Sequence, residues 1–546
     1  MNQQTILGKV RNLPVLCVLL LCAAAIAFGQ AGRGSITGVV SDPSGAVVKG
    51  AQVVALNHAT GVTLHTTTND AGLYSFVSLT PGLYELTASQ KGFESVAQDN
   101  VTVSVDQVTT VGIALRVGNV TETITVSTAP PLVDTSNSTV GQLIESTNIE
   151  RFPTLTRNIY DLIQLSAGVT PANGSASSAD SQAIQNISSG RPGVDVSSYT
   201  INGAIVGSVY YMLDGSPLGI AENNLGAIIP AMQIPEDGVD EFRVETQNTP
   251  ASYQSGAAGV ISLVSKSGGD ELHGDAFAYI RPDVLAANEY FNKQDQLLAG
   301  LSNQAPSFHR YQEGGAIGGP ILHKKLFFFG DYEDTRQKLY DNSSIFTVPT
   351  TAEAAGDFSA DNYTIYNPLV GDNPDGTRQE FPVHNVITSY APVSPTAAAF
   401  LAHMPKCNYP NPSTCDSATD EHLNNFQKPG LDPFTAHRFD VRVDYYKSEK
   451  QRLFSRFSYA KLTTQGVNAF GNDWDPNYAQ NITNARNFII GDDYTINSTT
   501  VLQLRYSFTR HFENQGGDPQ QDGFDITTLG FPASLAAAPT APRVGP

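Results

Sequence analysis

The sequence predicts a mainly β protein that is exported and carries strands of a transmembrane β-barrel. Three observations support this prediction. A leader-like segment occupies the first thirty residues, short alternating segments fill residues 34–116, and longer aromatic-rich alternating segments follow Glu271. Alternation of apolar and polar residues is typical of strands, and the length of the segments separates a soluble domain from a membrane-spanning one.

Residues 1–30 have the organisation of a secretory signal peptide. Lys9 and Arg11 precede the apolar run Leu13–Phe28, and small residues stand near the end of that run. The alternative is a transmembrane anchor. That reading is disfavoured because the run has about 16 residues and contains Pro14, whereas a spanning helix needs roughly 20 apolar residues. We therefore expect cleavage and export.

The composition excludes several classes of function. The formal net charge of −20 opposes a nucleic-acid partner, because affinity for phosphate backbones comes from Lys and Arg. After the leader, no stretch approaches 18 apolar residues in a row, which excludes spanning helices and leaves spanning strands open. The chain has no phosphate-binding glycine loop, nucleophile elbow or zinc-protease motif. We predict no catalytic residue and no cofactor, and we do not expect an enzyme.

Residues 34–116 predict a small β-sandwich, in which the turn signals DPSG, NDAG, TPG and KGF separate short strands. The runs GxVxDPSGAxVxGAxV, TNDAGLYSF and LTPGLYELTASQKGF resemble the carboxypeptidase regulatory-like domain. This resemblance implies a transthyretin-like sandwich without the peptidase zinc site. His58 and His65 lack metal-ligand spacing, so we expect them to be surface residues and predict no metal site.

Residues 119–135 form a linker that contains a short β-prone segment. Five consecutive residues in it resemble a TonB box: Glu122, Thr123, Ile124, Thr125 and Val126. An uncovered segment of this kind can add itself as a strand to the sheet edge of a partner, which the resemblance identifies as a TonB-type energy-coupling protein. The alternative is a linker strand without a partner.

Residues 136–270 contain three runs in a recognisable order: GQLIESTNIERFPTLTRNIYDLIQLSAGVTP, TINGAIVGSVYYMLDGSPLG and IPEDGVDEFRVETQNTPASYQSGAAGVISLVSKSGG. They resemble the α+β plug domain of TonB-dependent transporters. The first run predicts a short helix around four apolar residues, which are Ile159, Leu162, Ile163 and Leu165. Many small residues suit a domain that must yield inside a surrounding wall.

Two polar features of this plug-like region need an interpretation. The run Leu213–Gly215 predicts a tight turn rather than a catalytic aspartate. Four acidic residues precede and begin a strand, namely Glu236, Asp237, Asp240 and Glu241, and they could mimic a carboxylate pair or a calcium site. We interpret them as a solvated acidic turn.

From residue 271 to residue 546 the alternating segments become longer. In residues 502–509, leucine, tyrosine and phenylalanine alternate with glutamine, arginine, serine and threonine, and residues 441–445 and 452–459 repeat the pattern. The segments have about 10 to 13 residues, against roughly 5 to 6 for a soluble strand, and they end in Tyr and Phe as membrane girdles do. We expect about seven strands of a partial outer-membrane β-barrel.

Residues from about 360 to 430 are polar and rich in Pro and Asn, which predicts a long extracellular loop. The loop holds Cys407 and Cys415, the two cysteines that remain after the leader. In an oxidising compartment we expect them to form a local disulfide, contributing on the order of 2.5 kcal/mol in the chain-entropy model. The alternative is a metal or catalytic thiol, but no His or Cys cluster stands beside them.

Three further runs carry the most extensive resemblance: YQEGGAIGGPILHKKLFFFGDYEDTRQ, FTVPTTAEAAGDFS and HRFDVRVDYYKSEKQRLFSRFSYA. They resemble the start of the barrel in Oar-like TonB-dependent outer-membrane transporters. The resemblance implies a protein of the outer membrane, with its plug and N-terminal domain facing the periplasm. It also implies a TonB-type partner, contact with outer-membrane lipid, and an unidentified substrate, for which a glycan or a peptide is a candidate.

Transporters of this kind close with about 22 strands, so some seven strands predict the N-terminal part of a longer barrel, from a truncated gene or a partial sequence. An open sheet in lipid would leave edge groups unpaired at several kcal/mol each. Two alternatives stay open. One is an exported adhesion module that binds a carbohydrate or a protein, and the other is a truncated transporter without function.

Overall fold

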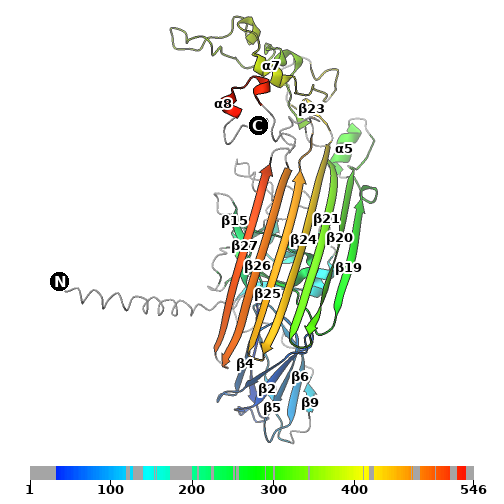
Figure 1. Ribbon diagram of the computed structural model, residues 1–546, viewed down its shortest axis with the longest axis vertical. Helices are drawn as coiled ribbons and strands as arrows, with labels where there is room; N and C mark the ends of the chain where they lie inside the picture. The colour runs from blue at the N-terminus through cyan, green and yellow to red at the C-terminus, as the bar shows by residue number, and fades with distance from the viewer. Residues whose placement is uncertain are drawn as a thin grey trace, which may run out of the picture.

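The chain forms three domains that follow one another along the sequence (Figure 1). The computed structural model describes residues 32–118, 123–126, 139–152, 154, 157–171, 199–205, 208–222, 227–249, 253, 258–288, 290–298, 302–305, 307–341, 345–409, 411–416, 424–428, 430–468, 470, 480–497, 500–516 and 526–536. The expected signal peptide lies outside these residues. None of the helices in the described part has the length and apolar composition needed to cross a membrane.

The N-terminal domain is a sandwich of two sheets. One sheet has the order β4-β1-β7 with β8 also paired to β1, and the other has the order β3-β2-β5-β6-β9. The strands are β1 (Gly34–Ser41), β2 (Gln52–Asn57), β3 (Thr63–Thr67), β4 (Leu73–Leu79), β5 (Gly82–Ser89), β6 (Ser95–Val103), β7 (Val108–Thr110), β8 (Ile113–Ala114) and β9 (Thr123–Val126). Alternate residues such as Ile36, Val40, Val53 and Leu86 point between the sheets and are fully buried, as the two-residue period predicts.

The central domain is built on a five-stranded mixed sheet of order β10-β17-β18-β13-β14. Strands β13 and β18 run parallel, and both are buried along their whole length because other parts of the chain cover the sheet. The elements are β10 (Val140–Glu145), α3 (Ser146–Arg151), η1 (Ile159–Leu165), β11 (Val169–Pro171), β12 (Tyr199–Ile201), β13 (Val209–Leu213), β14 (Ser216–Pro217), β15 (Gly219–Glu222), β16 (Ala227–Pro230), η2 (Glu236–Gly238), β17 (Val239–Gln247) and β18 (Gly259–Ser265).

The short helix expected around Ile159 is a 3-10 helix, η1, capped by the Asn158 side chain, which accepts a hydrogen bond from the backbone N–H of Tyr160. Ile159, Leu162 and Ile163 are buried, whereas Leu165 is 44% exposed. The tight turn expected at Leu213–Gly215 joins β13 to β14, with positive φ angles at both Asp214 and Gly215. The local periodicity and turn chemistry therefore predicted both elements of this domain.

The third domain is a seven-stranded antiparallel sheet of order β19-β20-β21-β24-β25-β26-β27, which we call the wall. Its strands have 10 to 19 residues, and all but β19 are longer than the sequence indicated. They are β19 (His273–Pro282), β20 (Phe308–Leu322), β21 (Leu326–Asp341), β24 (Gly430–Ser448), β25 (Gln451–Gln465), β26 (Gln480–Asn497) and β27 (Thr500–Gly516). The expected fold class, a mainly β chain with the first strands of a barrel, is confirmed.

Short turns join wall strands at the end where the N-terminal domain lies, and long connections join them at the opposite end (Figure 1). The longest connection runs between β21 and β24, from Asp341 to Gly430, and so begins earlier than the expected loop at about residue 360. The connections and the described C-terminal segment contain η3 (Asp283–Leu285), α5 (Tyr290–Leu298), β22 (Ile345–Phe346), α6 (Thr351–Ala354), η4 (Ile387–Ser389), α7 (Pro395–Leu401), β23 (Phe426–Gln427), η5 (Ile526–Leu529) and α8 (Ala533–Ala536). Short turns at one end and long loops at the other are typical of outer-membrane barrels.

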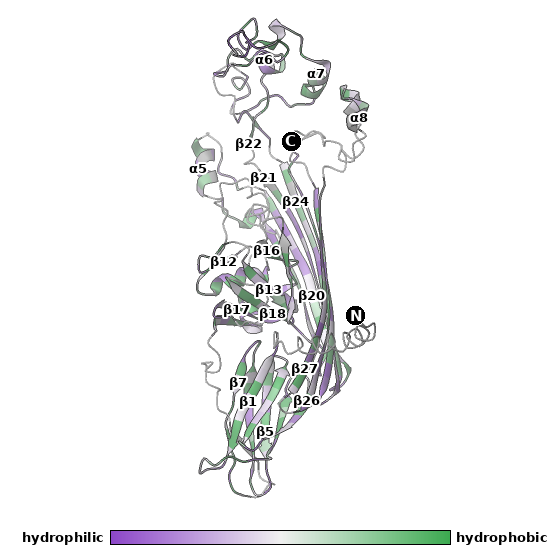
Figure 2. Ribbon diagram, turned by 90° about the vertical axis from the view of Figure 1, so that its left-hand side faces the viewer, coloured by the Kyte–Doolittle hydropathy of each residue, from purple (hydrophilic) through white to green (hydrophobic). Residues whose placement is uncertain are grey.

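The central domain packs against one face of the wall, which we call the inner face (Figure 2). One apolar core joins residues of both, including Ile234 and Phe242 of the central domain and Ala436, Ala460 and Ala485 of the wall. Small alanines on the wall allow the two backbones to approach closely. Beside this core the inner face also buries charged residues such as Asp440, Arg442 and Arg456, so the contact between the two domains is apolar in one part and charged in another.

Candidate functional site

The segment that resembles a TonB box lies beside the N-terminal sandwich. Glu122 falls outside the described residues, while residues Thr123 to Val126 form β9. Strand β9 pairs in parallel with β6, so that Ile124 lies opposite Val96 and Val126 opposite Gln98. The sequence led us to expect an uncovered segment. The structure differs, because one edge of β9 is occupied by β6, and only its other edge is available to a further strand.

The two cysteines lie in the long connection between β21 and β24. A disulfide joins Cys407 to Cys415, with 5.8 Å between their Cα atoms. Cys415 is buried, and Cys407 packs beside the small apolar cluster formed by Val348, Phe426 and Val467. The bond ties a local loop within this connection, far along the chain from β9 and from the central domain.

The main chemical feature of the molecule is a cluster of charges around Asp214, where the central domain meets the inner face of the wall. The turn between β13 and β14 carries Asp214 to the wall, and both of its carboxylate oxygens are engaged. Oδ1 accepts from Arg442 Nη1 at 3.1 Å, and Oδ2 lies 2.9 Å from Arg456 Nε. Ser265 of β18 donates from its backbone N–H and from its hydroxyl to the same carboxylate, at 3.0 and 2.8 Å. All three charged side chains are at most 2% exposed.

The wall arginines of this cluster are held in place by neighbours on the wall itself. Arg442 makes a two-pronged contact with Asp444, at 2.8 and 3.1 Å, and Arg456 donates to Asn487 Oδ1 at 2.6 Å. Asp440 accepts a hydrogen bond from the Ser458 hydroxyl and lies 3.5 Å from Arg456. The fork of a guanidinium suits this kind of bidentate recognition of carboxylates, so the wall presents its arginines to Asp214 in a fixed orientation.

The charge on Asp214 is stabilised by this arrangement. Burial alone would raise the pKa of Asp214, but Arg442 and Arg456, together with the hydrogen bonds from Ser265, outweigh burial and hold the pKa below its usual value. Asp214 therefore remains ionised at neutral pH. Because each charge would be costly to bury alone, the pairing fixes how the central domain is seated against the wall.

A second charged cluster surrounds Arg157, which precedes η1. Its guanidinium lies 2.7 Å from Asp237, 3.6 Å from Glu236 and 3.1 Å from Glu333 of the wall strand β21. It also lies over the ring of Phe277 on β19, 4.0 Å from the ring centre. Burial would lower the pKa of Arg157, but the three carboxylates outweigh burial and raise it. Arg157 thus forms ion pairs both with carboxylates of its own domain and with a carboxylate of the wall.

The expectation of a solvated acidic turn at Glu236, Asp237, Asp240 and Glu241 was wrong. Glu236 and Glu241 are 6% exposed, and Asp237 and Asp240 are partly buried. Burial raises the pKa of Asp240 to about 6 and raises the pKa of Glu241 well above its ordinary value. These carboxylates are buried because this segment packs against wall strands β20 and β21 and against the N-terminal sandwich, whose Val105 donates to Glu241, and local sequence does not reveal these contacts.

The N-terminal sandwich is docked by a third set of polar contacts. Arg33, just before β1, lies 3.9 Å from Asp493 of β26 and stacks 5.0 Å from the centre of the Phe454 ring. Burial, aided by the nearby charge of Arg452, lowers the pKa of Arg33 to about 9. On the other side, the backbone N–H of Val105 donates to Glu241 of the central domain.

Several arginine side chains stack on the ring of Phe454. Its ring is 2% exposed, and the guanidiniums of Arg442 and Arg505 lie 5.4 and 5.0 Å from its centre. Gly491 is the residue paired with Phe454 across the sheet, and a Cβ at this glycine would overlap the ring. Stacking of cations on an aromatic face holds several like charges at one place on the inner face.

The sequence contained part of the signal for this site. The alternation in residues 441–445 and 452–459 placed Arg442, Arg452 and Arg456 on the polar face of their strands, but it did not show what covers that face. Asp214 was recognised only as a turn residue, because its partner Arg442 is 228 residues away along the chain. Arg157 and Arg33 carried no local signal. Contacts between distant segments made these residues functional candidates.

Comparison with known proteins agrees with this architecture. A family model described as "Outer membrane beta barrel domain" matches residues 264–545, and one described as "Carboxypeptidase regulatory-like domain" matches residues 35–116. The chain is similar to the TonB-dependent transporter Oar of Myxococcus xanthus, with 23% identity over 267 residues, which cover 48% of this chain and 23% of that protein. The chain thus spans only about a quarter of the length of this relative.

Among solved structures, the chain is similar to the outer-membrane transporter YddB from Escherichia coli, with 10% identity and a TM-score of 0.42. That match covers 69% of this chain and 39% of YddB. It is also similar to a mutant of the ferric enterobactin receptor PfeA from Pseudomonas aeruginosa in complex with enterobactin, with 12% identity, a TM-score of 0.40, and coverage of 71% and 44%. These similar proteins are transporters and receptors rather than enzymes.

Proposed function

The chain belongs to the outer membrane beta barrel domain family and is a protein of the outer membrane, and from this premise we propose that it acts in TonB-dependent uptake. In this proposal the wall forms part of a barrel, and the central domain is a plug that blocks the passage along the inner face. A TonB-type energy-coupling protein engages β9 and pulls, and the plug rearranges so that substrate can pass. The substrate is taken from outside the cell, where the long connections of the wall lie.

One observation carries the proposal, namely that the wall buries its polar face and exposes its apolar face. Arg442, Arg456 and Asp444 of the inner face are at most 2% exposed, whereas Val441 and Phe457 on the outer face are 48% and 38% exposed. A water-soluble sheet would show the reverse, because apolar surface in contact with water costs roughly 25 cal/mol per Å². Lipid against the outer face and a plug against the inner face account for both halves of the pattern.

The charged contact between plug and wall supports a plug that can move. Besides the shared apolar core, the polar contacts between the two domains include the ion pairs of Asp214 with Arg442 and Arg456, and of Arg157 with Glu333. When such groups separate in a water-filled lumen, water replaces the lost partners, so the cost of opening is smaller than for an apolar contact of the same area. The paired charges therefore specify one closed arrangement without making it permanent.

Strand β9 is suited to transmit the pull. It is a short strand at the edge of its sheet, and it precedes β10, the first strand of the central domain. A partner could pair with the free edge of β9 by main-chain hydrogen bonds, or could displace β6 and take its place. In either case, force applied at β9 reaches the central domain through the linker before it reaches the wall.

The substitution Ile124→Pro tests this role. Proline removes the main-chain donor of residue 124 and disfavours pairing in the middle of a four-residue strand. We expect the affinity of the detergent-purified chain for the C-terminal domain of the TonB-type protein, measured by isothermal titration, to fall about tenfold or more. Ile124→Val is the matched control, because it keeps both the donor and the β-propensity, and its affinity should equal that of the native chain.

If the native chain and Ile124→Pro bind the C-terminal domain of the TonB-type protein with equal affinity, β9 is not the strand that couples to this partner. The wider proposal predicts that the exported chain partitions with outer-membrane lipid. An exported chain that stays in solution without detergent would contradict it. That second result would instead favour the secreted adhesion module, since a soluble adhesin has no apolar band to cover.

A further inference from the structure

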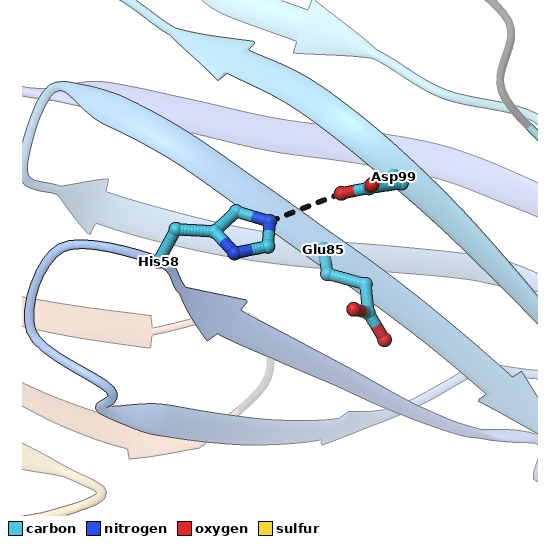
Figure 3. Close-up of side chains that lie close together, drawn as sticks. All are labelled: His58, Glu85 and Asp99. Carbon is cyan, nitrogen blue, oxygen red and sulfur yellow. Dashed lines mark hydrogen bonds and ion pairs between the residues drawn. The ribbon is translucent and has the colours of Figure 1, made fainter.

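Three side chains with metal-binding chemistry converge on the outer surface of the five-stranded sheet of the N-terminal sandwich (Figure 3). His58 follows β2, Glu85 lies on β5, and Asp99 lies on β6. One ligating atom from each lies within 4.8 Å of the other two. His58 Nε2 and Asp99 Oδ1 are 3.0 Å apart. The group is separate from the charged contacts at the wall and takes no part in the proposed uptake.

The local backbone brings these residues together. Between Tyr84 and Leu86 the pairing of β5 with β6 shifts register, so that two residues of β6, Asp99 and Asn100, lie opposite the single residue Glu85 of β5. Asn100 has a positive φ of 60°, and its backbone N–H is bonded to the Asp99 carboxylate at 2.8 Å. A β-bulge of this kind re-aims a side chain. Here it directs Asp99 towards His58, whose backbone N–H donates to Leu83 O on β5 and so fixes the start of the β2–β3 turn.

The spacing of the three groups is close to that of a bound transition-metal ion. In tetrahedral coordination at about 2.0 to 2.2 Å, two ligand atoms of the same zinc ion lie roughly 3.4 Å apart. The ligand atoms of the present triangle lie within 4.8 Å of one another, so closing it around an ion needs any edge to shorten by about 1.4 Å at most. His58 is 42% and Asp99 35% exposed, so their side chains can make these movements, and solvent can supply a fourth ligand.

The ligand types select the class of metal. An imidazole with two carboxylates matches zinc and similar borderline ions, whereas calcium and magnesium prefer an all-oxygen set. Two carboxylates balance the charge of a divalent cation, and the net charge of −20 on the chain raises the local concentration of cations. We propose that His58, Glu85 and Asp99 form a surface binding site for a divalent transition-metal ion, with zinc as the best fit. This proposal differs from our expectation that His58 and His65 form no metal site, since 27 and 14 residues separate the three proposed ligands in the sequence and hide the cluster.

Equilibrium dialysis of the detergent-solubilised full chain against Zn²⁺, with the bound metal counted by atomic absorption, tests the proposal. We expect His58→Ala to bind one equivalent less than the native chain, and Asp99→Asn to lower the affinity of that equivalent by about tenfold or more. His65→Ala is the matched control, because His65 is an exposed histidine of the neighbouring strand β3 that contacts Glu449 instead. Its zinc content should equal that of the native chain.

The proposal is overturned if His58→Ala retains the full zinc content, or if the native chain binds no more zinc than a chelator-treated blank. It is also overturned if His65→Ala loses the same amount as His58→Ala, because the binding would then belong to histidines in general. A further comparison fixes the metal class. Ca²⁺ or Mg²⁺ in excess should not displace the zinc, and displacement by either would identify an acidic surface patch rather than a transition-metal site.

Discussion

The N-terminal sandwich and the wall are both made of alternating strands, yet they bury opposite faces. In β1 of the sandwich, Ile36 and Val40 are fully buried and Val39 is 37% exposed. In β24 of the wall, Arg442 is 1% exposed and Val441 is 48% exposed. A two-residue period therefore shows that a strand has two unlike faces, but not which of them becomes the interior.

The neighbours of each sheet decide which face is buried. The two sheets of the sandwich cover each other and exclude water from their apolar faces. The wall is covered by a domain that presents Asp214, Arg157 and their partners, so its polar face is the internal one. Its exposed leucines, valines and aromatic residues then require lipid, and this requirement makes the wall a membrane structure and the sandwich a soluble one.

The largest effect should follow from removing a charge at the polar face that the wall buries. Asp214→Asn keeps a residue that tolerates the positive φ of 50° at the turn, and it removes only the negative charge. Arg442 and Arg456 then lose a buried carboxylate partner, and a loss of about 3 kcal/mol in the free energy of unfolding is expected. Denaturant unfolding in detergent micelles, followed by far-ultraviolet circular dichroism, measures it.

Asp492→Asn is the control for this change. Asp492 lies on β26 and accepts hydrogen bonds from Gln451, and no arginine is paired with its carboxylate among the described contacts. Its replacement should cost well under half as much as Asp214→Asn, roughly 1 kcal/mol or less. If both variants lose the same free energy of unfolding, the cluster at Asp214 contributes no more to stability than an ordinary polar contact. The burial of charge on the inner face would then not distinguish the wall from the sandwich energetically.

The second effect concerns the apolar faces. Leu504 on β27 and Leu73 on β4 are similarly exposed, at 54% and 44%, but we assign lipid to the first and water to the second. In lipid, Leu504→Arg should destabilise the folded chain by roughly 2 to 3 kcal/mol, whereas Leu73→Arg should change stability by about 0.5 kcal/mol or less. Unfolding measured in liposomes gives both values. A small loss for Leu504→Arg would show that β27 does not face hydrocarbon.

The fold could be predicted well from the sequence because its strands and turns follow from local residue patterns. The β1–β8 sandwich follows from turn residues at regular spacing, and the seven wall strands follow from segments with a two-residue period. Six of the seven strands, with 15 to 19 residues, exceed the expected 10 to 13, because pairing continues beyond the apolar alternation into polar ends such as residues 480–484 of β26.

The candidate site was much less predictable, for a reason of distance. Asp214 was recognised as a turn, and Arg442 and Arg456 as members of a polar face, but their contact spans more than two hundred residues. The acidic run beginning at Glu236 was misread because most acidic runs are solvated, and only enclosure by the wall and the sandwich makes this one internal. Contacts between residues of different domains can be identified only once the fold is known.

The smallest effect concerns Asp240, a partly buried carboxylate on β17 of the central domain. Burial raises the pKa of Asp240 to about 6, from an ordinary value of 3.8. Between these values the folded chain holds a proton that the unfolded chain has released. The free energy of unfolding should therefore decrease as the pH rises through this window and increase as the pH falls. Asp240 is partly exposed, so screening reduces the change to about 1 kcal/mol.

Asp240→Asn cannot ionise, so it should remove this contribution and leave the titration of every other group in place. The difference between native and variant unfolding free energies, measured from pH 3.5 to 7 in steps, should therefore slope between about pH 4 and 6 and be flat above. Asp70→Asn, at an exposed turn of the sandwich, provides the baseline. A slope of the same size for Asp70→Asn would mean that Asp240 is as well hydrated as a surface residue. The central domain would then not be enclosed at β17, and the contrast between a wall that buries charge and a sandwich that buries apolar residues would hold only around Asp214.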